Sequence, residues 1–323
     1  MGWEGSWMKT IIVALGGNAL LRPHQIGTID EQREPAQTSA RQIRQLIEMG
    51  YRVVITHGNG PQVGNILLQN ELAKNRTPPM PLDVCGSESQ GMIGYLIQQS
   101  LHNELRASGI DLPVVTLLTQ VIVDKNDPAF QAPSKPVGPF CSREEAEKAV
   151  REKGETWMED SGRGWRKAVP CPYPREFAEV GTIAGLIEQG TVLIAGGGGG
   201  IPVIRENDGS LRGVEAVVDK DLAASLLAKS IKSDMLAILT DVSQVALNYG
   251  RPNQQNLSRL TVGDARAYLE QGYFGKGSME PKIRAAVEFV LAGEGQALIT
   301  SLDNLVEGVK GLQGTRIVPD EQT

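Results

Sequence analysis

Short aliphatic runs alternate with longer amphipathic stretches along most of the chain. The short runs are bounded by glycine or turn residues, which is typical of strands that are buried on both faces of a parallel sheet. This pattern predicts strands at residues 10–15, 52–56, 114–118, 191–195, 236–240 and 297–300. It predicts helices at residues 36–49, 62–74, 87–108, 175–189, 220–230, 262–271 and 282–292.

This alternation predicts an α/β fold, namely a three-layer αβα sandwich with an open, mainly parallel central sheet of roughly eight strands. Asn207-Asp208-Gly209 lies between two further aliphatic runs, at residues 202–205 and 211–217, and an Asp-Gly pair in this setting is a strong hairpin signal. We therefore expect part of the sheet to be antiparallel.

The stretch of residues 125–167 breaks the alternation. It carries a charged helical pattern at residues 143–153 and four prolines, Pro128, Pro133, Pro136 and Pro139. Long stretches of this kind inside a compact domain usually carry function or structure of their own. We predict an inserted lid subdomain here, within an N-terminal lobe of residues 9–190. A C-terminal lobe of residues 191–323 would follow, and residues 1–8 would form an N-terminal extension.

Composition narrows the class of protein. The net charge of −6 and the pI near 5.3 argue against a nucleic-acid binder, so an anionic ligand must be held by locally placed cations or backbone N–H groups. The three cysteines form no CxxC pair, which predicts neither a disulfide framework nor a zinc site. No apolar run reaches the ~18 residues of a membrane span, and residues 1–7 lack a signal-peptide pattern. We expect a cytoplasmic protein.

Three glycine-rich loops follow predicted strands. Gly16-Gly17-Asn18 follows the first strand, Gly58-Asn59-Gly60 follows the second, and a third loop contains Gly198 and Gly199. Glycine lets the backbone approach a ligand closely, so that successive N–H groups can point at phosphate oxygens. The carboxyl ends of parallel strands share one rim of the sheet, where ligands of open α/β folds bind. No P-loop, dinucleotide or protein-kinase motif is present, so we expect a phosphate site of another design.

Six sequence strings resemble the signatures of the carbamate kinases, a group within the amino acid kinase family. They are VALGGNAL at 13–20, THGNGPQVGN at 56–65, GRGWRK at 162–167, GGGGIPV at 197–203, VEAVVDKD at 214–221 and GSMEPK at 277–282. The resemblance implies the reversible reaction ATP + carbamate = ADP + carbamoyl phosphate, which would support ATP synthesis in arginine catabolism. It also implies Mg²⁺ carried by the ATP or ADP phosphates, no metal site of the protein's own, and a homodimer.

The resemblance also implies roles for individual residues. Lys135, in the lid, would reach carbamate and the transferring phosphoryl group; Lys220 would contact the nucleotide phosphates, and Lys282 the terminal phosphate. Asp221 would orient these lysines. The nucleoside is expected beside Asp241, Tyr249 and Met279.

The first glycine loop differs from that of related kinases. Enzymes such as acetylglutamate kinase resemble the pattern Lys-x-Gly-Gly there, whereas this chain has Ala14 at the lysine position. Lys135 from the lid would supply the missing cation, which favours carbamate over a larger carboxylate. Two alternatives stay open: a kinase for another small carboxylate or phosphate, and a nucleotide-binding regulatory protein that has lost catalysis.

Carbamate is already an anion, so its attack on phosphorus requires no general base, and catalysis depends on positioning and charge stabilisation. His57 could be named as a base, but a histidine at the end of a strand more often hydrogen-bonds to the backbone. Arg163 and Arg166 flank Trp165; they either meet anions or form a structural corner.

Overall fold

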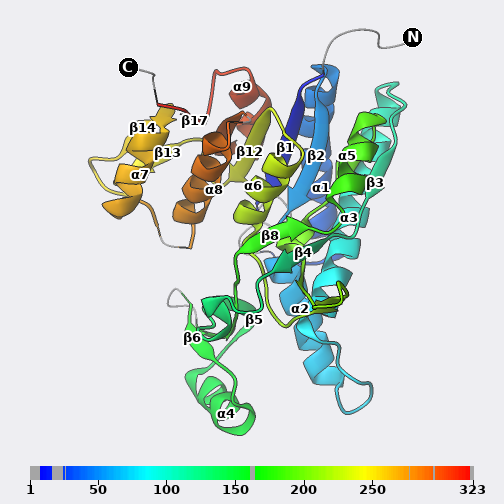
Figure 1. The fold of residues 1–323 in the computed structure, drawn as a ribbon, viewed down its shortest axis with the longest axis vertical. Helices are drawn as coiled ribbons and strands as arrows, with labels where there is room; N and C mark the ends of the chain where they lie inside the picture. Colours follow the sequence, from blue (N-terminus) through cyan, green and yellow to red (C-terminus); the bar gives the residue numbers. More distant parts are fainter. Residues whose placement is uncertain are drawn as a thin grey trace.

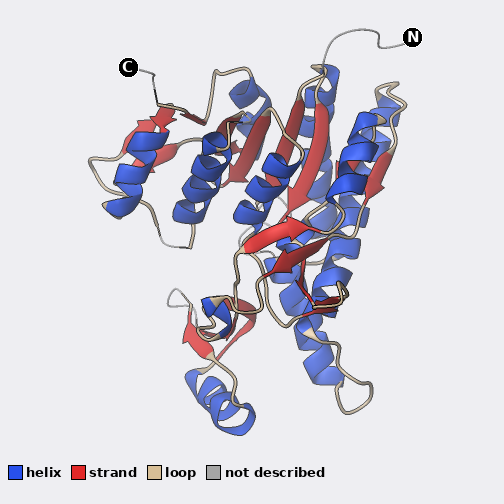
Figure 2. Ribbon diagram, in the orientation of Figure 1, coloured by secondary structure: helices blue, strands red, loops and turns tan. Residues whose placement is uncertain are grey.

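The computed structural model describes residues 8–16, 25, 27–160, 164–275, 277–293 and 295–320. Gly17, Asn18, Arg163 and residues 1–7 lie outside the described residues. A central sheet with helices on both faces forms most of the molecule, and a smaller body protrudes from it at the bottom of Figure 1, as the strand and helix colours of Figure 2 also show. The predicted αβα class is confirmed.

The central sheet has eight strands. In spatial order they are β15 (Arg259–Thr261), β17 (Thr315–Val318), β16 (Gln296–Ser301), β12 (Met235–Thr240), β1 (Thr10–Leu15), β2 (Arg52–His57), β9 (Val192–Ile194) and β3 (Val114–Thr116). Neighbouring strands are parallel except for β16 and β17. Because β1 and β2 lie at the centre and are covered on both faces, their side chains are buried almost throughout.

Side chains of β1 alternate between two hydrophobic cores. Ile11, Val13 and Leu15 join one core and Ile12 and Ala14 the other, as the two-residue period of a strand requires. The first core is shared with α1 (Ile29–Glu48), α3 (Leu82–Ala107) and α9 (Leu305–Val309). The second is shared with α5 (Val180–Glu188), α6 (Lys220–Ser230), α7 (Val262–Glu270) and α8 (Met279–Leu291).

The predicted hairpin exists, but it belongs to a different sheet from the one expected. The strands β10 (Ile201–Arg205) and β11 (Leu211–Gly213) pair antiparallel in a second sheet. That sheet also contains β4 (Gln120–Val123) and β8 (Pro174–Phe177). The chain enters β10 through Gly200, whose φ of +90° turns it away from the central sheet. In the central sheet, β17 and its parallel neighbour β15 run antiparallel to the other six strands. A separate ribbon pairs β13 (Val245–Leu247) with β14 (Gln255–Leu257).

The protruding body, residues 135–169, has a sheet of its own. It contains β5 (Lys135–Cys141), β7 (Trp165–Val169) and β6 (Trp157–Glu159), together with α4 (Arg143–Lys153). We call it the lid. The helix α4 has the predicted bounds because a Ser142–Glu145 capping box begins it and Gly154, in the left-handed conformation, ends it.

The lid meets the main body along α2 (Gly60–Ala73). The backbones of α2 and β5 approach so closely that a Cβ added at Gly64 would lie 3.3 Å from the Cα of Gly138. Farther along α2, the Lys153 ammonium of α4 pairs with the Glu71 carboxylate at 2.9 Å. Backbone contact and an ion pair therefore hold the lid to α2 at two separate places.

Three helices begin well away from their predicted starts, and one of them is α3, which begins at Leu82 rather than at residue 87. The helix α1 begins at Ile29 rather than at residue 36, because a capping box of Thr28 with Glu31 starts it and Pro35 is accommodated within it. The segment expected to be a helix at residues 175–189 is a strand up to Phe177 and becomes helical only at Val180. Pairing with β4 and the burial of Phe177, which is 0% exposed, hold this segment extended, so tertiary contacts overrode the helical pattern.

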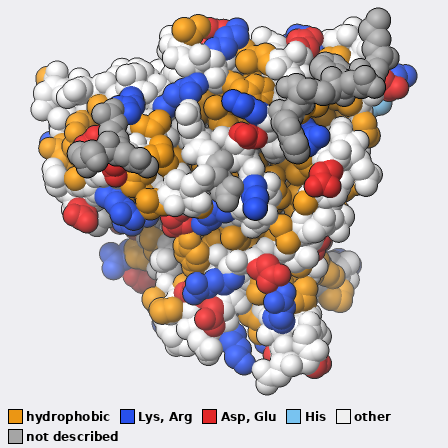
Figure 3. Space-filling model, turned by 45° about the horizontal axis from the view of Figure 1, so that its top comes forward, with side chains coloured by type: hydrophobic (Ala, Val, Ile, Leu, Met, Phe, Trp, Pro, Cys, Tyr) orange, Lys and Arg blue, Asp and Glu red, His pale blue; other side chains and the backbone are white. Residues whose placement is uncertain are grey.

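Acidic and basic side chains are interspersed over the face of the molecule drawn in Figure 3, without a continuous basic stripe. None of the helices in the described part of the chain combines the length and the apolar character that crossing a bilayer requires.

Candidate active site

Three lysines from distant parts of the chain meet at the first turn of α6. The Lys220 ammonium lies 2.6 Å from one oxygen of Asp221, and the Lys282 ammonium, from the first turn of α8, lies 3.3 Å from the other. The Lys135 ammonium, from the start of β5 in the lid, lies 3.0 Å from Asp219 Oδ2. The structure thus places Lys135, Lys220, Asp221 and Lys282 in one cluster.

The helix α6 starts here because Asp219 caps it. Its Oδ1 accepts hydrogen bonds from the backbone N–H groups of Asp221, at 3.0 Å, and Leu222, at 3.3 Å. An N-cap aspartate satisfies N–H groups that have no partner within the helix, and its charge is favourable at the positive end of the helix dipole. The cap therefore fixes the turn that carries Lys220 and Asp221.

Asp221 is a buried carboxylate held in its charged form. Burial alone raises its pKa, but the neighbouring charges and hydrogen bonds of Lys220 and Lys282 outweigh burial and leave the pKa below its usual value. Lys282 also donates to the backbone oxygen of Ser278 at 3.0 Å, which fixes the direction of its ammonium. Two lysines are thereby oriented by one carboxylate.

Lys135 is likewise held in its charged form. Burial lowers its pKa, but the charge of Asp219 and the hydrogen bond to it outweigh burial, so that the pKa lies above its usual value. Burial raises the pKa of the adjacent Cys171 thiol. The thiol therefore stays neutral. The charged groups of the cluster are three lysines and two aspartates, so its net charge is positive. The cluster suits a polyanionic ligand.

The glycines of the three loops that the structure describes lie at the same rim, where β1, β2 and β9 end side by side. Close backbone packing explains two of them: a Cβ at Gly16 would lie 2.8 Å from the carbonyl oxygen of Leu239, and one at Gly199 would lie 2.6 Å from that of Val218. Gly198 has a φ of +65°. A larger residue at these positions would collide with backbone or strain it.

The second loop joins β2 to α2. Gly58 donates its N–H to the carbonyl oxygen of Leu15 in β1 at 3.0 Å, and Gly60 is the first residue of α2. The Asn59 side chain donates to Ser89 Oγ at 2.8 Å and lies where a Cβ on Gly198 would strike it. The second and third glycine loops are therefore in direct contact.

His57 is neutral and bonded to the backbone. It is 1 % exposed, and its Nδ1 lies 2.9 Å from the carbonyl oxygen of Gly58, so Nδ1 carries the proton and donates it. Burial lowers the pKa of His57 to about 4, although the bond to Gly58 partly opposes this. The structure accords with the backbone role expected for this histidine.

Asp241, Tyr249 and Met279 line one cavity of about 210 Å³ beyond the carboxyl end of β12. Tyr273 and Phe274 also line it. Both rings pack edge-to-face against Tyr268 of α7, which fixes their positions. A cavity lined by both aromatic and polar residues suits the base of a nucleotide.

Arg166 forms a structural corner within the lid. Its guanidinium pairs with Asp160 at 3.0 Å, donates to the carbonyl oxygen of Gly138 at 2.8 Å and lies over the Phe140 ring. These contacts engage its Nε and Nη1 inside the lid, which favours the structural interpretation for this residue.

Within the described ranges, no three His, Cys, Asp or Glu side chains are grouped so that they could hold a metal ion. The carboxylates nearest the cluster, Asp219 and Asp221, are each bonded to lysines. A divalent cation at this site would therefore depend largely on oxygens that a ligand brings.

The sequence interpretation missed three residues of this region. Asp219 immediately precedes Lys220, and an aspartate directly before a helix is an N-cap signal that could have drawn attention to it. Tyr273 and Phe274 lie between two predicted helices, and nothing in their spacing connects them to Asp241 or Tyr249. Tertiary structure alone brings them to the cavity.

Comparison with known proteins gives full-length matches. The model of the amino acid kinase family matches residues 9–301. The carbamate kinase of Thermococcus kodakarensis is 52% identical over 314 residues, which cover 96% of this chain and 99% of that protein. The carbamate kinase of Pyrococcus furiosus is 51% identical over 313 residues. Carbamate kinase from Giardia lamblia bound to AMP-PNP is similar in structure, with a TM-score of 0.92 and 45% identity, over 97% of this chain and 99% of that one.

Proposed function

The chain belongs to the amino acid kinase family and, within it, to the carbamate kinases, and we propose that it catalyses ATP + carbamate = ADP + carbamoyl phosphate. One observation carries the proposal: lysines of the lid, of α6 and of α8 meet at two carboxylates of a single helical turn. Two anions must come together in this reaction, and positive charge placed in advance reduces their repulsion.

In this proposal the lysines stabilise charge and no side chain removes a proton. Lys220 and Lys282 meet the nucleotide phosphates, with Asp221 holding both ammonium groups in place. Lys135 approaches carbamate and the transferred phosphoryl group from the lid. His57 is neutral and donates to Gly58, which agrees with a reaction that requires no base.

We assign carbamate to the N-terminal lobe, residues 9–190, and the nucleotide to the C-terminal lobe, residues 191–323. The phosphates and carbamate would lie along the glycine rim, which includes Gly16, Gly58, Gly60, Gly198 and Gly199. The nucleoside would occupy the cavity lined by Asp241, Tyr249 and Met279, which adjoins α8 and so Lys282. The AMP-PNP bound by the Giardia relative supports a nucleotide site in this fold.

Further parts of the proposal rest on the family resemblance. Mg²⁺ would arrive with ATP or ADP, held mainly by the phosphates, as this cation commonly is in kinases. The physiological role would be ATP synthesis in arginine catabolism. A cytoplasmic location is supported by the three cysteines, which are all free thiols.

A coupled assay of ATP formed from ADP, Mg²⁺ and carbamoyl phosphate tests the activity. We expect rapid ATP formation, and slower phosphorylation when N-acetylglutamate or glutamate and ATP are supplied instead. Faster turnover of those carboxylates would identify a different amino acid kinase. Binding of ADP without any ATP formation would identify a regulatory protein.

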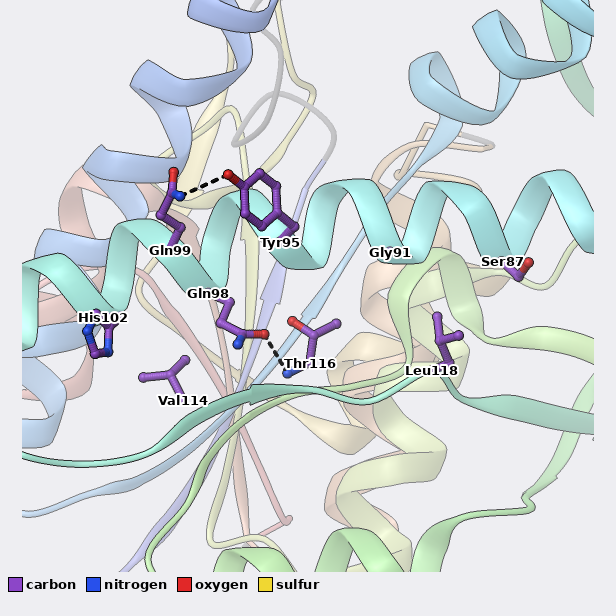
Figure 4. A pocket seen from close by; sticks show the side chains of 9 residues that line it. All are labelled: Ser87, Gly91, Tyr95, Gln98, Gln99, His102, Val114, Thr116 and Leu118. Atoms are coloured by element: carbon purple, nitrogen blue, oxygen red, sulfur yellow. Dashed lines mark hydrogen bonds between the residues drawn. The ribbon is translucent and has the colours of Figure 1, made fainter.

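We also propose that the chain forms a homodimer through α3 and the edge strand β3. The exposed side of α3 carries Gly91, Tyr95 and His102, within a stretch of residues 89–103 that contains no Lys, Arg, Asp or Glu. Beside it, a cavity of about 430 Å³ opens towards β3 (Figure 4). Gln98 accepts the backbone N–H of Thr116 there at 2.9 Å. Depletion of charge is typical of interface cores.

Analytical ultracentrifugation tests the dimer. We expect the wild type to sediment as two chains and Tyr95→Glu, at a ring that is 53% exposed, to sediment as one. Leu72→Glu is the matched control, since Leu72 is 75% exposed on α2, away from this face. A monomeric wild type, or a Tyr95→Glu variant that stays dimeric, would contradict the assignment.

A further inference from the structure

The two oxygens of the Asp219 carboxylate have different partners. Oδ1 accepts the N–H groups of Asp221 and Leu222 and so caps α6, whereas Oδ2 accepts the ammonium of Lys135 at 3.0 Å. Lys135 is 84 residues away in sequence and begins β5 of the lid. One side chain therefore joins the lid to the turn that carries Lys220 and Asp221.

We propose that Asp219 is a positioning residue: it holds Lys135 beside the phosphate site and couples the lid to α6 before the substrates bind. This inference rests on the proposed function and gives a role to Asp219, a residue of the VEAVVDKD string to which the resemblance assigned none. Oδ1 is committed to the helix cap, so the carboxylate has one orientation, and Oδ2 is directed at the lid. When an anionic substrate enters, Lys135 is already charged and close.

The charge distribution around the cluster supports a separate holder for Lys135. Lys220 and Lys282 share Asp221, whose side chain is 4% exposed, so both of its oxygens already have partners. The groups that influence Lys135 electrostatically are Asp219, Cys171 and, more weakly, Asp221. With a neutral thiol at Cys171, Asp219 is the principal counter-charge of the lid lysine.

A second lid contact provides the control. The Lys153–Glu71 pair joins the lid to α2 far from the lysine cluster, and Glu71 is about half exposed. We expect Glu71→Gln to loosen the lid while leaving the lysine cluster unaltered. Comparing the variants at these two contacts distinguishes an effect of loosening the lid from an effect of misplacing Lys135.

The decisive variant is Asp219→Asn. Asparagine is as good an N-cap as aspartate, but its NH₂ group would face the Lys135 ammonium, so the cap survives and the lid contact is lost. We expect kcat/KM for carbamoyl phosphate to fall by about tenfold or more, the effect of losing a charge-assisted hydrogen bond. ADP affinity and the thermal midpoint should change little. Asp219→Ser, which also caps helices, should behave in the same way.

Three further measurements exclude a merely structural role. Amide hydrogen exchange in β5 and β7, measured without substrates, should be faster in Asp219→Asn and in Glu71→Gln, but only the first variant should lose activity. The high-pH limb of kcat/KM should move to lower pH in Asp219→Asn, because burial without its counter-charge lowers the pKa of Lys135. In a Lys135→Met background, Asp219→Asn should have no further effect on kcat/KM.

Unchanged activity and unchanged exchange in Asp219→Asn would overturn the inference. So would an effect that simply adds to that of Lys135→Met, because Asp219 would then act independently of the lysine. The exchange experiment requires no turnover. A wild type that makes no ATP from ADP and carbamoyl phosphate would refute the proposed function, while the exchange result would still test the contact.

Discussion

Asp221→Asn removes the carboxylate that two lysines share. Lys220 and Lys282, with side chains 21% and 14% exposed, would then face each other without their counter-charge. Removing one partner of a buried pair costs about 3–5 kcal/mol, and the partial exposure of both lysines places this case near ~3 kcal/mol. The lost charge in the first turn of α6 adds about 0.5 kcal/mol through the helix dipole. In a chain of this length the Tm should fall by about 5 °C.

Scanning calorimetry at pH 7 measures this fall, and the coupled assay should show a rate lower by about 10² or more, the usual effect of disturbing preorganised charge. Asp208→Asn, in the exposed turn between β10 and β11, controls for the loss of one aspartate. The pH dependence of the Tm difference between the wild type and Asp221→Asn tests the reasoning further. Because folding lowers the pKa of Asp221 below 3.8, its stabilisation is complete above pH 3.8 and is lost as the pH falls through the folded value.

The difference in Tm between wild type and Asp221→Asn should therefore be largest near neutral pH and shrink in acid. Equal Tm values at pH 7 would refute the reasoning. A difference that widens as the pH falls would refute it equally, because the wild-type carboxylate would then not be the stabilising partner of the two lysines.

Three other predictions concern single side chains. Lys135→Ala should lower turnover by about 10²–10³ with little change in the Kd for ADP measured by titration calorimetry, and an equal loss of both would show that Lys135 holds the nucleotide. In the wild type, the free energy of unfolding should fall by about 3 kcal/mol as the pH falls from 6.5 to about 4, because in this range His57 is protonated only in the unfolded chain. The His57→Gln variant should not show this fall. Calorimetric midpoints across this range check the slope, and an unchanged slope would contradict the neutral assignment. Tyr249→Ala should weaken ADP binding about tenfold if its ring stacks on the base, with kcat nearly unchanged at saturation; unaltered affinity would place the base elsewhere.

Much of the fold could be predicted from periodicity. The strands of the sheet centre are aliphatic on both faces, so β1, β2 and β12 appear in the sequence as short continuous runs. The start of α1 could not be placed, because Pro35 resembles a helix boundary whereas the helix is capped by Thr28, about two turns earlier. The strand β8 was missed because only its partner β4 makes it extended.

Site residues could be predicted from the sequence where they lie within a short motif. Lys220, Asp221 and Lys282 were found by motif, and the structure brings them together. Asp219 was not singled out, although its place directly before a predicted helix is an N-cap signal. Its second oxygen acquires a partner only when the lid folds back, and that contact spans 84 residues.

The contact of Gly64 with Gly138 has a mechanical consequence. The helix α2 and the strand β5 meet there through main-chain atoms, with no side chain between them. Because a backbone contact cannot adjust by changing a side-chain rotamer, it fixes the angle of the lid. A single methyl group at position 64 would act as a wedge 3.3 Å from the neighbouring Cα. We therefore expect the size of residue 64 to set how closely the lid approaches α2.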